Sequence, residues 1–140
     1  MNKNTAGVIR FLGYRITKLE YVCDASYEFA KEGEMCFRFQ KSETAIGENG
    51  IQLILASHIF FGSEEDDMES SPYRLSLEIA ARYESDEPWN EKWEQNALAI
   101  LFPYVRAIVS SVTAQSGREP LVMPTVNIAE LFKKSKEQQQ

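Results

Sequence analysis

The titratable and nucleophilic side chains of this sequence do not form a recognisable catalytic pattern. His58 is the only histidine, and it stands in an apolar segment, which is more typical of a hydrogen-bonded core residue than of a catalytic base. Cys23 and Cys36 are not a Cys-x-x-Cys pair, so we expect two buried free thiols in a reducing compartment. The sequence also lacks a P-loop, a dinucleotide-binding motif and a His/Cys ligand cluster. We therefore expect no enzyme activity, no cofactor and no metal.

A run of acidic residues lies between Gly62 and Pro72. It lacks the alternating Asp ligands and central glycine of an EF-hand calcium loop, so a solvated hairpin loop is the better interpretation. The whole chain has 15 basic and 21 acidic residues and a net charge of −6. This charge repels phosphate backbones and anionic membrane surfaces, so we do not expect a nucleic-acid partner.

The elements that position these residues begin with strands. Apolar and polar residues alternate over 73–84 and 35–39, which predicts strands with one dry face and one wet face. Residues 51–61 are apolar at both sets of positions, which predicts a strand covered on both sides. Residues 8–23 predict a less regular strand, broken at a glycine. Four successive strands with turn-rich connections indicate an antiparallel sheet, within a single domain over residues 1–140.

Helices follow the strands. From Pro88 to Ser116 the apolar period changes to 3.6, with proline suited to a first helical turn and Gly117 to a C-terminal cap. A short second helix is predicted from Asn127, which has a capping-box glutamate three residues later. The polar tail of about residues 133–140 is expected to fray. The sequence therefore predicts an α+β fold with one long helix and one short helix.

The long helix is apolar on one arc and small on the other. Proline at position 103 removes a backbone hydrogen bond and predicts a kink. A helix of this composition is usually buried on both sides, and the chain has no second long helix to cover the small arc. The same helix from another copy is the expected cover, although a monomer whose second helix folds over the arc is the alternative. The predicted oligomer interface comprises Ala99, Pro103, Ala107, Ser110 and Ser111.

The apolar run over residues 97–112 is shorter than the ~20 residues that a bilayer requires. It also contains Pro103 and Arg106, so we expect no membrane insertion. The N-terminal segment has no apolar stretch of signal-peptide length, because basic residues interrupt it. We expect a cytoplasmic protein.

The second half of the chain resembles the SecB family of protein-export chaperones. The similarity lies in Ile100–Arg106 (ILFPYVR), Gly117, Pro120 and residues 124–132 (PTVNIAELF). One departure is Thr125, which stands where the family commonly has proline, while Pro124 comes one place earlier. The resemblance implies a SecB-like fold, in which a four-stranded antiparallel sheet packs against a long kinked helix and a short C-terminal helix. It also implies a dimer of dimers, that is, a homotetramer.

The same resemblance implies an ATP-independent holdase that binds unfolded preproteins and passes them to SecA of the Sec translocation machinery. Clients of such a chaperone bind in grooves, and a site for many unfolded chains needs exposed, adaptable apolar side chains. The corresponding positions are Met35, Phe37, Phe39, Leu121, Val122 and Met123. The alternative for the first three is an ordinary core position facing the helix.

Three acidic residues are candidates for SecA binding, namely Glu20, Asp24 and Glu78. A second function within the family is the stabilisation of an antitoxin from a toxin–antitoxin system by a SecB-like chaperone. A hypothesis from another class is an oligomeric α+β domain that holds a small apolar ligand. It would need a closed pocket with converging polar groups, whereas a holdase needs an open groove.

Overall fold

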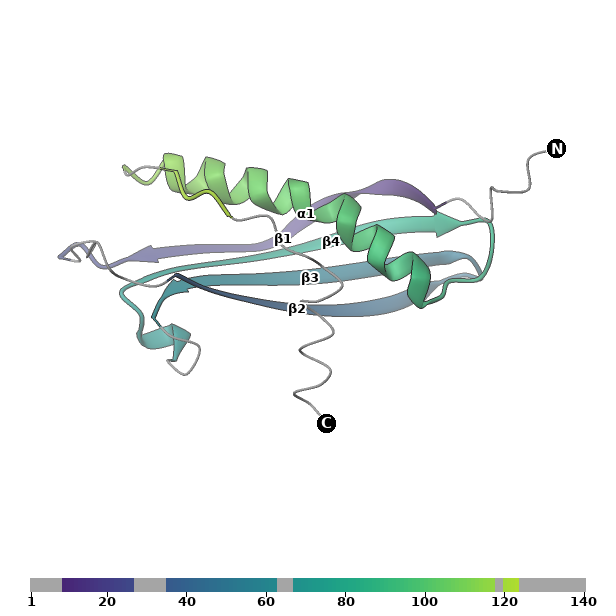
Figure 1. Cartoon of the computed structure of the whole chain (residues 1–140), viewed down its shortest axis with the longest axis horizontal. Helices are drawn as coiled ribbons and strands as arrows, with labels where there is room; N and C mark the ends of the chain where they lie inside the picture. Colours follow the sequence, from purple (N-terminus) through teal and green to yellow (C-terminus); the bar gives the residue numbers. More distant parts are fainter. Residues whose placement is uncertain (1–8, 27–34, 63–66, 118–119, 124–140) are drawn as a thin grey trace. The chain divides into compact units, whose positions relative to one another are not determined.

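The fold is given by a computed structural model that describes residues 9–26, 35–62, 67–117 and 120–123. The elements are β1 (Ile9–Cys23), β2 (Met35–Ile46), β3 (Gly50–Phe61), the 3₁₀ turn η1 (Met68–Ser70), β4 (Tyr73–Ser85) and α1 (Glu91–Ala114). The strands form one four-stranded antiparallel sheet in the order β1-β4-β3-β2 (Figure 1). The predicted sheet and long helix are confirmed. In this order β1 and β2 are the edge strands of the sheet. The short helix expected from Asn127 and the tail lie outside the described residues.

The chain divides into two compact units. The first unit comprises residues 1–11 and 84–140, and the second comprises residues 12–83. The first contains α1, while the second contains β2, β3 and most of β1 and β4. The expectation of a single domain stays a prediction.

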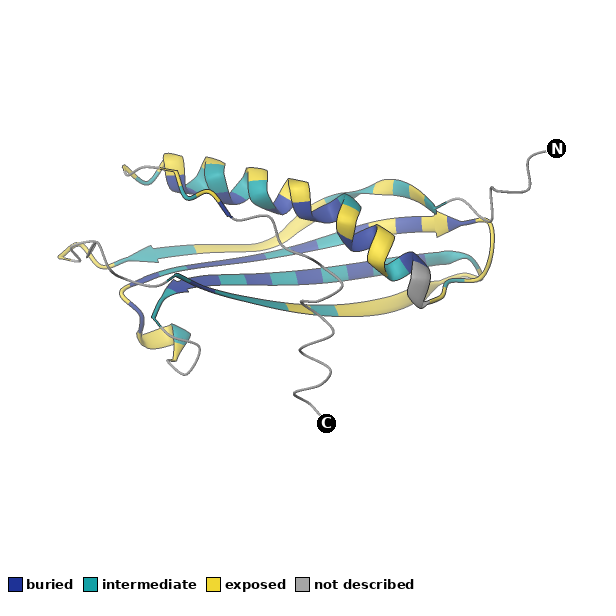
Figure 2. Cartoon of the chain, in the orientation of Figure 1, coloured by how far each residue is buried: buried dark blue, intermediate teal, exposed yellow. Residues whose placement is uncertain are grey.

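The sheet of the second unit has an inner and an outer face. His58 Nδ1 of β3 lies 3.1 Å from Ser76 Oγ of β4, so the even-numbered residues of these strands share one face. Because side chains alternate along a strand, the odd-numbered residues share the other. We call the odd-numbered side the inner face, because its residues are buried (Figure 2). Its buried residues are Ile51, Leu53, Leu55, Ser57 and Ile59 of β3 and Tyr73, Leu75, Leu77, Ile79, Ala81 and Tyr83 of β4.

The prediction that β3 is covered on both sides holds at Phe60, which is fully buried on the outer face, but not along the whole strand. On the outer face Gln52, Ile54 and His58 are only half-buried. Apolar residue type alone did not distinguish them from the inner face, since Ile54 lies between two fully buried leucines. His58 has a hydrogen-bond partner, as predicted, but it lies on the outer face and not in the core. Of the two free thiols, Cys36 is buried and Cys23 is half-buried.

Strand β1 is irregular, as the sequence predicted. Gly13 has a φ of 123°, a left-handed conformation that L side chains rarely adopt. The chain continues as a strand beyond this residue, but Leu12, Ile16 and Leu19 stay about half exposed. An edge strand with apolar side chains in solvent is a surface that another chain can cover.

In the first unit, α1 begins at Glu91, later than the sequence predicted. Pro88 lies before the helix, and the first turn is closed by the Trp93 N–H donating to the Asn90 carbonyl at 3.0 Å. Pro103 lies inside the helix. One arc is buried, comprising Trp93, Ala97, Leu98, Leu101, Phe102, Val105, Val109 and Thr113.

The length argument against a membrane span was also wrong. Residues Trp93–Ala114 are 22 residues long, and by length and composition this segment is apolar enough to cross a membrane. The core helix of a soluble protein meets the same criterion. One arc of this segment is buried, and its remaining residues are half-buried or exposed.

Candidate functional site

Three apolar side chains line the first half of the edge strand β2. Met35, Phe37 and Phe39 alternate along the strand, and each is half-buried. In the β2–β3 register they lie opposite Phe61, Ile59 and Ser57, which places them on the inner face. We call these three residues the β2 patch.

The β2 patch differs from the neighbouring core in exposure. Its cross-strand partners Ile59 and Ser57 are fully buried, whereas Phe37 and Phe39 keep part of their surface in solvent. In a single chain, a core residue on an edge strand and a residue of an open groove would both be half-buried. Half-burial is therefore consistent with both predictions for these residues, a core position and a client-binding groove. In either case the patch provides aromatic surface that a ligand can cover.

A polar group next to the patch has no partner. The Ser57 hydroxyl is buried and forms no hydrogen bond within the described part of the chain. Leaving a hydroxyl unpaired costs about 1–3 kcal/mol. The unpaired Ser57 hydroxyl belongs to the residue opposite Phe39, the last residue of the β2 patch.

A second predicted segment, Leu121 to Met123, lies in the first unit and is tied to the end of α1. The Leu121 N–H donates to Thr113 Oγ1 at 2.7 Å, and Ser110 Oγ donates to the Leu121 carbonyl at 3.0 Å. Val122 is 72% exposed, whereas Met123 is only 1% exposed. The exposed apolar side chain of this segment is therefore Val122 and not the adaptable methionine that the sequence favoured.

The two hydroxyls that hold this segment were not predicted for that role. Ser110 was expected in the oligomer interface, but it is half-buried against Leu121. Thr113 is buried and also donates to the Val109 carbonyl at 2.8 Å. Two hydroxyl residues three positions apart, near the end of a helix, are the only sequence signal that could have indicated them. The segment belongs to the first unit and the β2 patch to the second.

The other predicted interface residues form a line along α1. Ala99, Pro103, Ala107 and Ser111 follow each other at intervals of four residues, and all four are exposed. Residues four apart lie on the same side of a helix. We call these four residues the small stripe. Its role as an interface between copies of the chain stays a prediction.

The acidic residues proposed for a partner have local hydrogen bonds. Glu78 Oε2 accepts from Thr17 Oγ1 at 2.6 Å, which connects β4 to β1 on the outer face. Asp24 accepts from the Ser26 N–H at 2.9 Å and from its hydroxyl at 2.7 Å. The backbone bond, followed by the hydroxyl bond, lowers the pKa of Asp24. Glu20 is exposed on β1, and these three residues do not form one cluster through the hydrogen bonds of the described chain.

His58 is an ionisable group whose pKa is altered by its surroundings. Burial lowers its pKa, the positive charges of Lys18 and Arg38 lower it further, and Glu78 opposes them. The ring is therefore neutral at pH 7. Within the described ranges, no three His, Cys, Asp or Glu side chains are grouped so that they could hold a metal ion. What the described surfaces offer chemically is apolar burial.

Comparison with known proteins matches the second half of the chain to the family model for preprotein translocase subunit SecB, over residues 74–139. A protein of Methanocaldococcus jannaschii, described as uncharacterized, is 40% identical over 70 residues, which are 47% of this chain and 45% of that protein. The protein-export protein SecB of Magnetococcus marinus is 46% identical over 39 residues, which are 28% of this chain and 25% of that protein. The aligned part spans less than half the length of these relatives.

A solved structure matches over more of the chain. The SecB-like chaperone of Mycobacterium tuberculosis, solved in complex with a peptide from an antitoxin, has a TM-score of 0.66 to this chain. The match covers 85% of this chain and 91% of that one, at 15% sequence identity. At this identity the likeness shows the fold alone.

Proposed function

We propose that this chain is a SecB-like, ATP-independent chaperone that holds unfolded polypeptides, because the SecB family model matches residues 74–139 and the fold is similar to that of a SecB-like chaperone. The observation that carries the proposal is the β2 patch, a row of half-buried aromatic and thioether side chains at a sheet edge. Such side chains contact many different clients without fixed directional bonds. A mechanism of this kind uses neither a catalytic group nor a cofactor.

Binding would combine two physical contributions. Covering Phe37 and Phe39 removes the rest of their apolar surface from water, which contributes at most a few kcal/mol for each side chain. The outer edge of β2 adds backbone hydrogen bonds to an extended client without selecting its side chains. Val122, which is exposed in the segment from Leu121 to Met123, is a further apolar side chain available for contact.

The direct test is a holdase assay without nucleotide. The purified protein should suppress the aggregation of two unrelated, chemically denatured proteins at about stoichiometric ratios, because burial does not depend on a particular sequence. A protein that leaves both aggregation curves unchanged, but binds a single folded partner or one small apolar ligand, would contradict the proposal.

We further propose that the chain is a cytoplasmic homotetramer, assembled through the small stripe of α1. The support is that this stripe is exposed along the helix and consists of residues that let another backbone approach closely. Native mass spectrometry at micromolar concentration should give a mass near four chains. Neither nucleic acid nor membrane insertion is part of this proposal.

For the destination of the clients we propose handover to SecA, with contacts on the outer face that include Glu78. Reversing this charge, Glu78→Lys, should weaken SecA binding more at low salt than at high salt, because screening already weakens the charge interaction at high salt. Arg74→Gln is the control, since it changes a charge on the same strand and face.

The second candidate is a dedicated role with an antitoxin. It is favoured by one observation, the antitoxin peptide bound to the M. tuberculosis chaperone of the same fold. If the purified protein binds no SecA but binds an antitoxin encoded beside its own gene, this candidate replaces handover to SecA. The holdase proposal itself would survive that result.

A further inference from the structure

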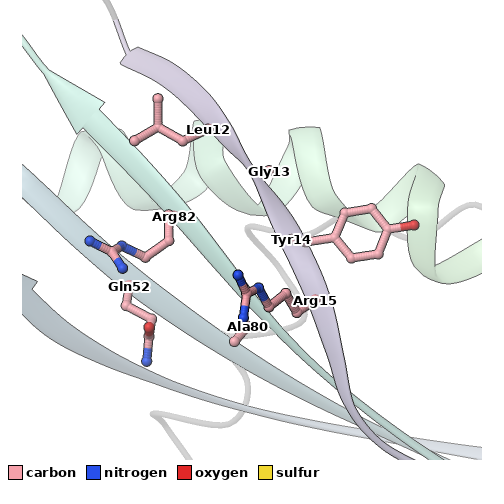
Figure 3. A pocket seen from close by; sticks show the side chains of 7 residues that line it. All are labelled: Leu12, Gly13, Tyr14, Arg15, Gln52, Ala80 and Arg82. Carbon is pink, nitrogen blue, oxygen red and sulfur yellow. The ribbon is translucent and has the colours of Figure 1, made fainter.

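The outer face of the second unit carries a hollow of about 500 Å³. It is lined by residues 12–15 of β1, Gln52 of β3, and Ala80 and Arg82 of β4. Figure 3 shows the Arg15 side chain reaching from β1 toward Ala80, and the Arg82 guanidinium near the base of the Gln52 side chain, whose carboxamide points away from it. Two arginines and one glutamine, from three different strands, therefore line one hollow. It is separate from the inner face that holds the β2 patch.

The absence of side chains makes this hollow. Gly13 has no Cβ, and a Cβ added there would meet nothing within 4 Å. Its φ of 123° also disfavours any other residue, so the position stays open. Ala80 is the small residue of β4 that lines the same hollow. Larger side chains at these two positions would fill the space between the arginines.

The two arginines are exposed to solvent. Within the described part of the chain, Arg15 and Arg82 form no ion pair, and no carboxylate lines the hollow. Arg10, on the same strand as Arg15, lies 2.7 Å from Asp86 and 3.7 Å from Glu84. In a chain of net charge −6, acidic groups are available in excess, yet this pair has none. A guanidinium is suited to bind a carboxylate through a two-pronged hydrogen bond.

We propose that this hollow docks an acidic peptide segment of a partner protein, in which a carboxylate side chain stands beside an apolar one. Arg15 and Arg82 bind the carboxylate, and Gln52 donates to or accepts from the peptide group. Leu12 lines the hollow and is 54% exposed, so it covers the apolar neighbour. The contact goes beyond client holding and does not depend on it.

The surroundings select a short acidic segment over a nucleic acid. Glu78 lies on the same strand face, two residues from Ala80, and places a negative charge between the hollow and the basic residues Lys18 and Arg38 that act on His58. A nucleic acid would need a longer track of cations to offset the chain's negative charge. One or two carboxylates match the two guanidinium groups that the hollow offers.

The test uses the full-length protein and a fluorescent peptide of about eight residues that alternates leucine and glutamate, with a leucine–glutamine peptide as its uncharged counterpart. The glutamate peptide should bind more tightly, and Arg15→Gln and Arg82→Gln should each weaken its binding by about tenfold, with the difference shrinking at high salt. Arg82→Lys keeps the charge but loses the forked geometry, so it should lose part of the affinity.

Two controls separate this site from other surfaces. Arg74→Gln removes a charge from the same face, but its guanidinium donates to the Glu69 and Ser71 carbonyls outside the hollow, so the glutamate peptide should bind it as it binds wild type. Phe37→Ser alters the β2 patch and should leave the preference for glutamate over glutamine unchanged. Equal binding of both peptides, or wild-type binding by either glutamine variant, would overturn the proposal. So would tighter binding of a short single-stranded oligonucleotide or of inorganic phosphate at the same arginines.

Discussion

Strands β4 and β2 have the same alternating pattern but different environments. On β4, Leu75, Leu77 and Ile79 are 0–1% exposed, whereas Phe37 and Phe39 on β2 keep part of their surface in water. The difference follows from strand order, because β4 has a neighbour on each side and β2 is an edge. Equal patterns therefore support different roles, with β4 stabilising the fold and β2 offering apolar surface to a client.

The largest expected difference between the two strands comes from truncating one apolar side chain on each of them. Leu77→Ala should lower the free energy of unfolding by about 2–5 kcal/mol, because it opens a cavity in a fully buried position. Phe39→Ala should cost less stability than Leu77→Ala, since its ring is already partly solvated. Urea denaturation followed by circular dichroism measures both. An equal or larger loss for Phe39→Ala would assign the β2 patch to the core.

The same contrast between buried and open residues occurs on α1. Ala107→Glu places a charge in the small stripe, where a tight contact between copies would leave it unpaired. It should therefore dissociate the proposed tetramer at micromolar concentration while the helix content stays unchanged. Native mass spectrometry and far-ultraviolet circular dichroism give the two measurements. Gln40→Glu adds the same charge at an exposed position of β2, which is not part of the small stripe, so this control should leave the mass of the assembly unchanged.

The smallest expected effect is the pH dependence of stability that comes from His58, on the outer face of β3. Burial, with help from Lys18 and Arg38, lowers the pKa of His58 below its usual 6.5, so the unfolded chain binds a proton before the folded chain does. Stability should be full above pH 6.5 and should decrease as the pH falls through that value toward the folded pKa. His58→Gln should flatten this part of the profile of urea midpoint against pH. A wild-type midpoint that rises on acidification through this range would contradict the assigned cause.

Much of the sheet and the long helix could be predicted from the sequence, because periodicity depends on local alternation. Tyr73 to Tyr83 show it most clearly, since every odd residue there is buried. The order of the strands could not be predicted in this way, because it depends on pairing between distant residues. For that reason the sequence did not show that β3 has a half-open outer face, or that β2 lies at an edge.

The candidate sites were predictable only in part. Residue type identified the aromatic row of β2 and the small residues of α1, and the structure leaves both at least partly open. The burial of Met123 depends on two hydroxyls that hold the adjacent Leu121, a contact that composition does not indicate. The hollow at Arg15 and Arg82 was missed because its residues are far apart in the sequence and meet only through the pairing of β1 with β4.

The measurement that tests the central claim most directly is the affinity for a denatured client of the variant that carries both Phe37→Ser and Phe39→Ser. The two changes remove most of the aromatic surface of the β2 patch, so binding should weaken by more than tenfold, measured by fluorescence anisotropy with a labelled unfolded protein. The thermal unfolding midpoint and the assembly mass, measured on the same sample, should stay near wild type. Unchanged affinity in a folded variant, or loss of the fold itself, would contradict the assignment of these residues to a client-binding surface.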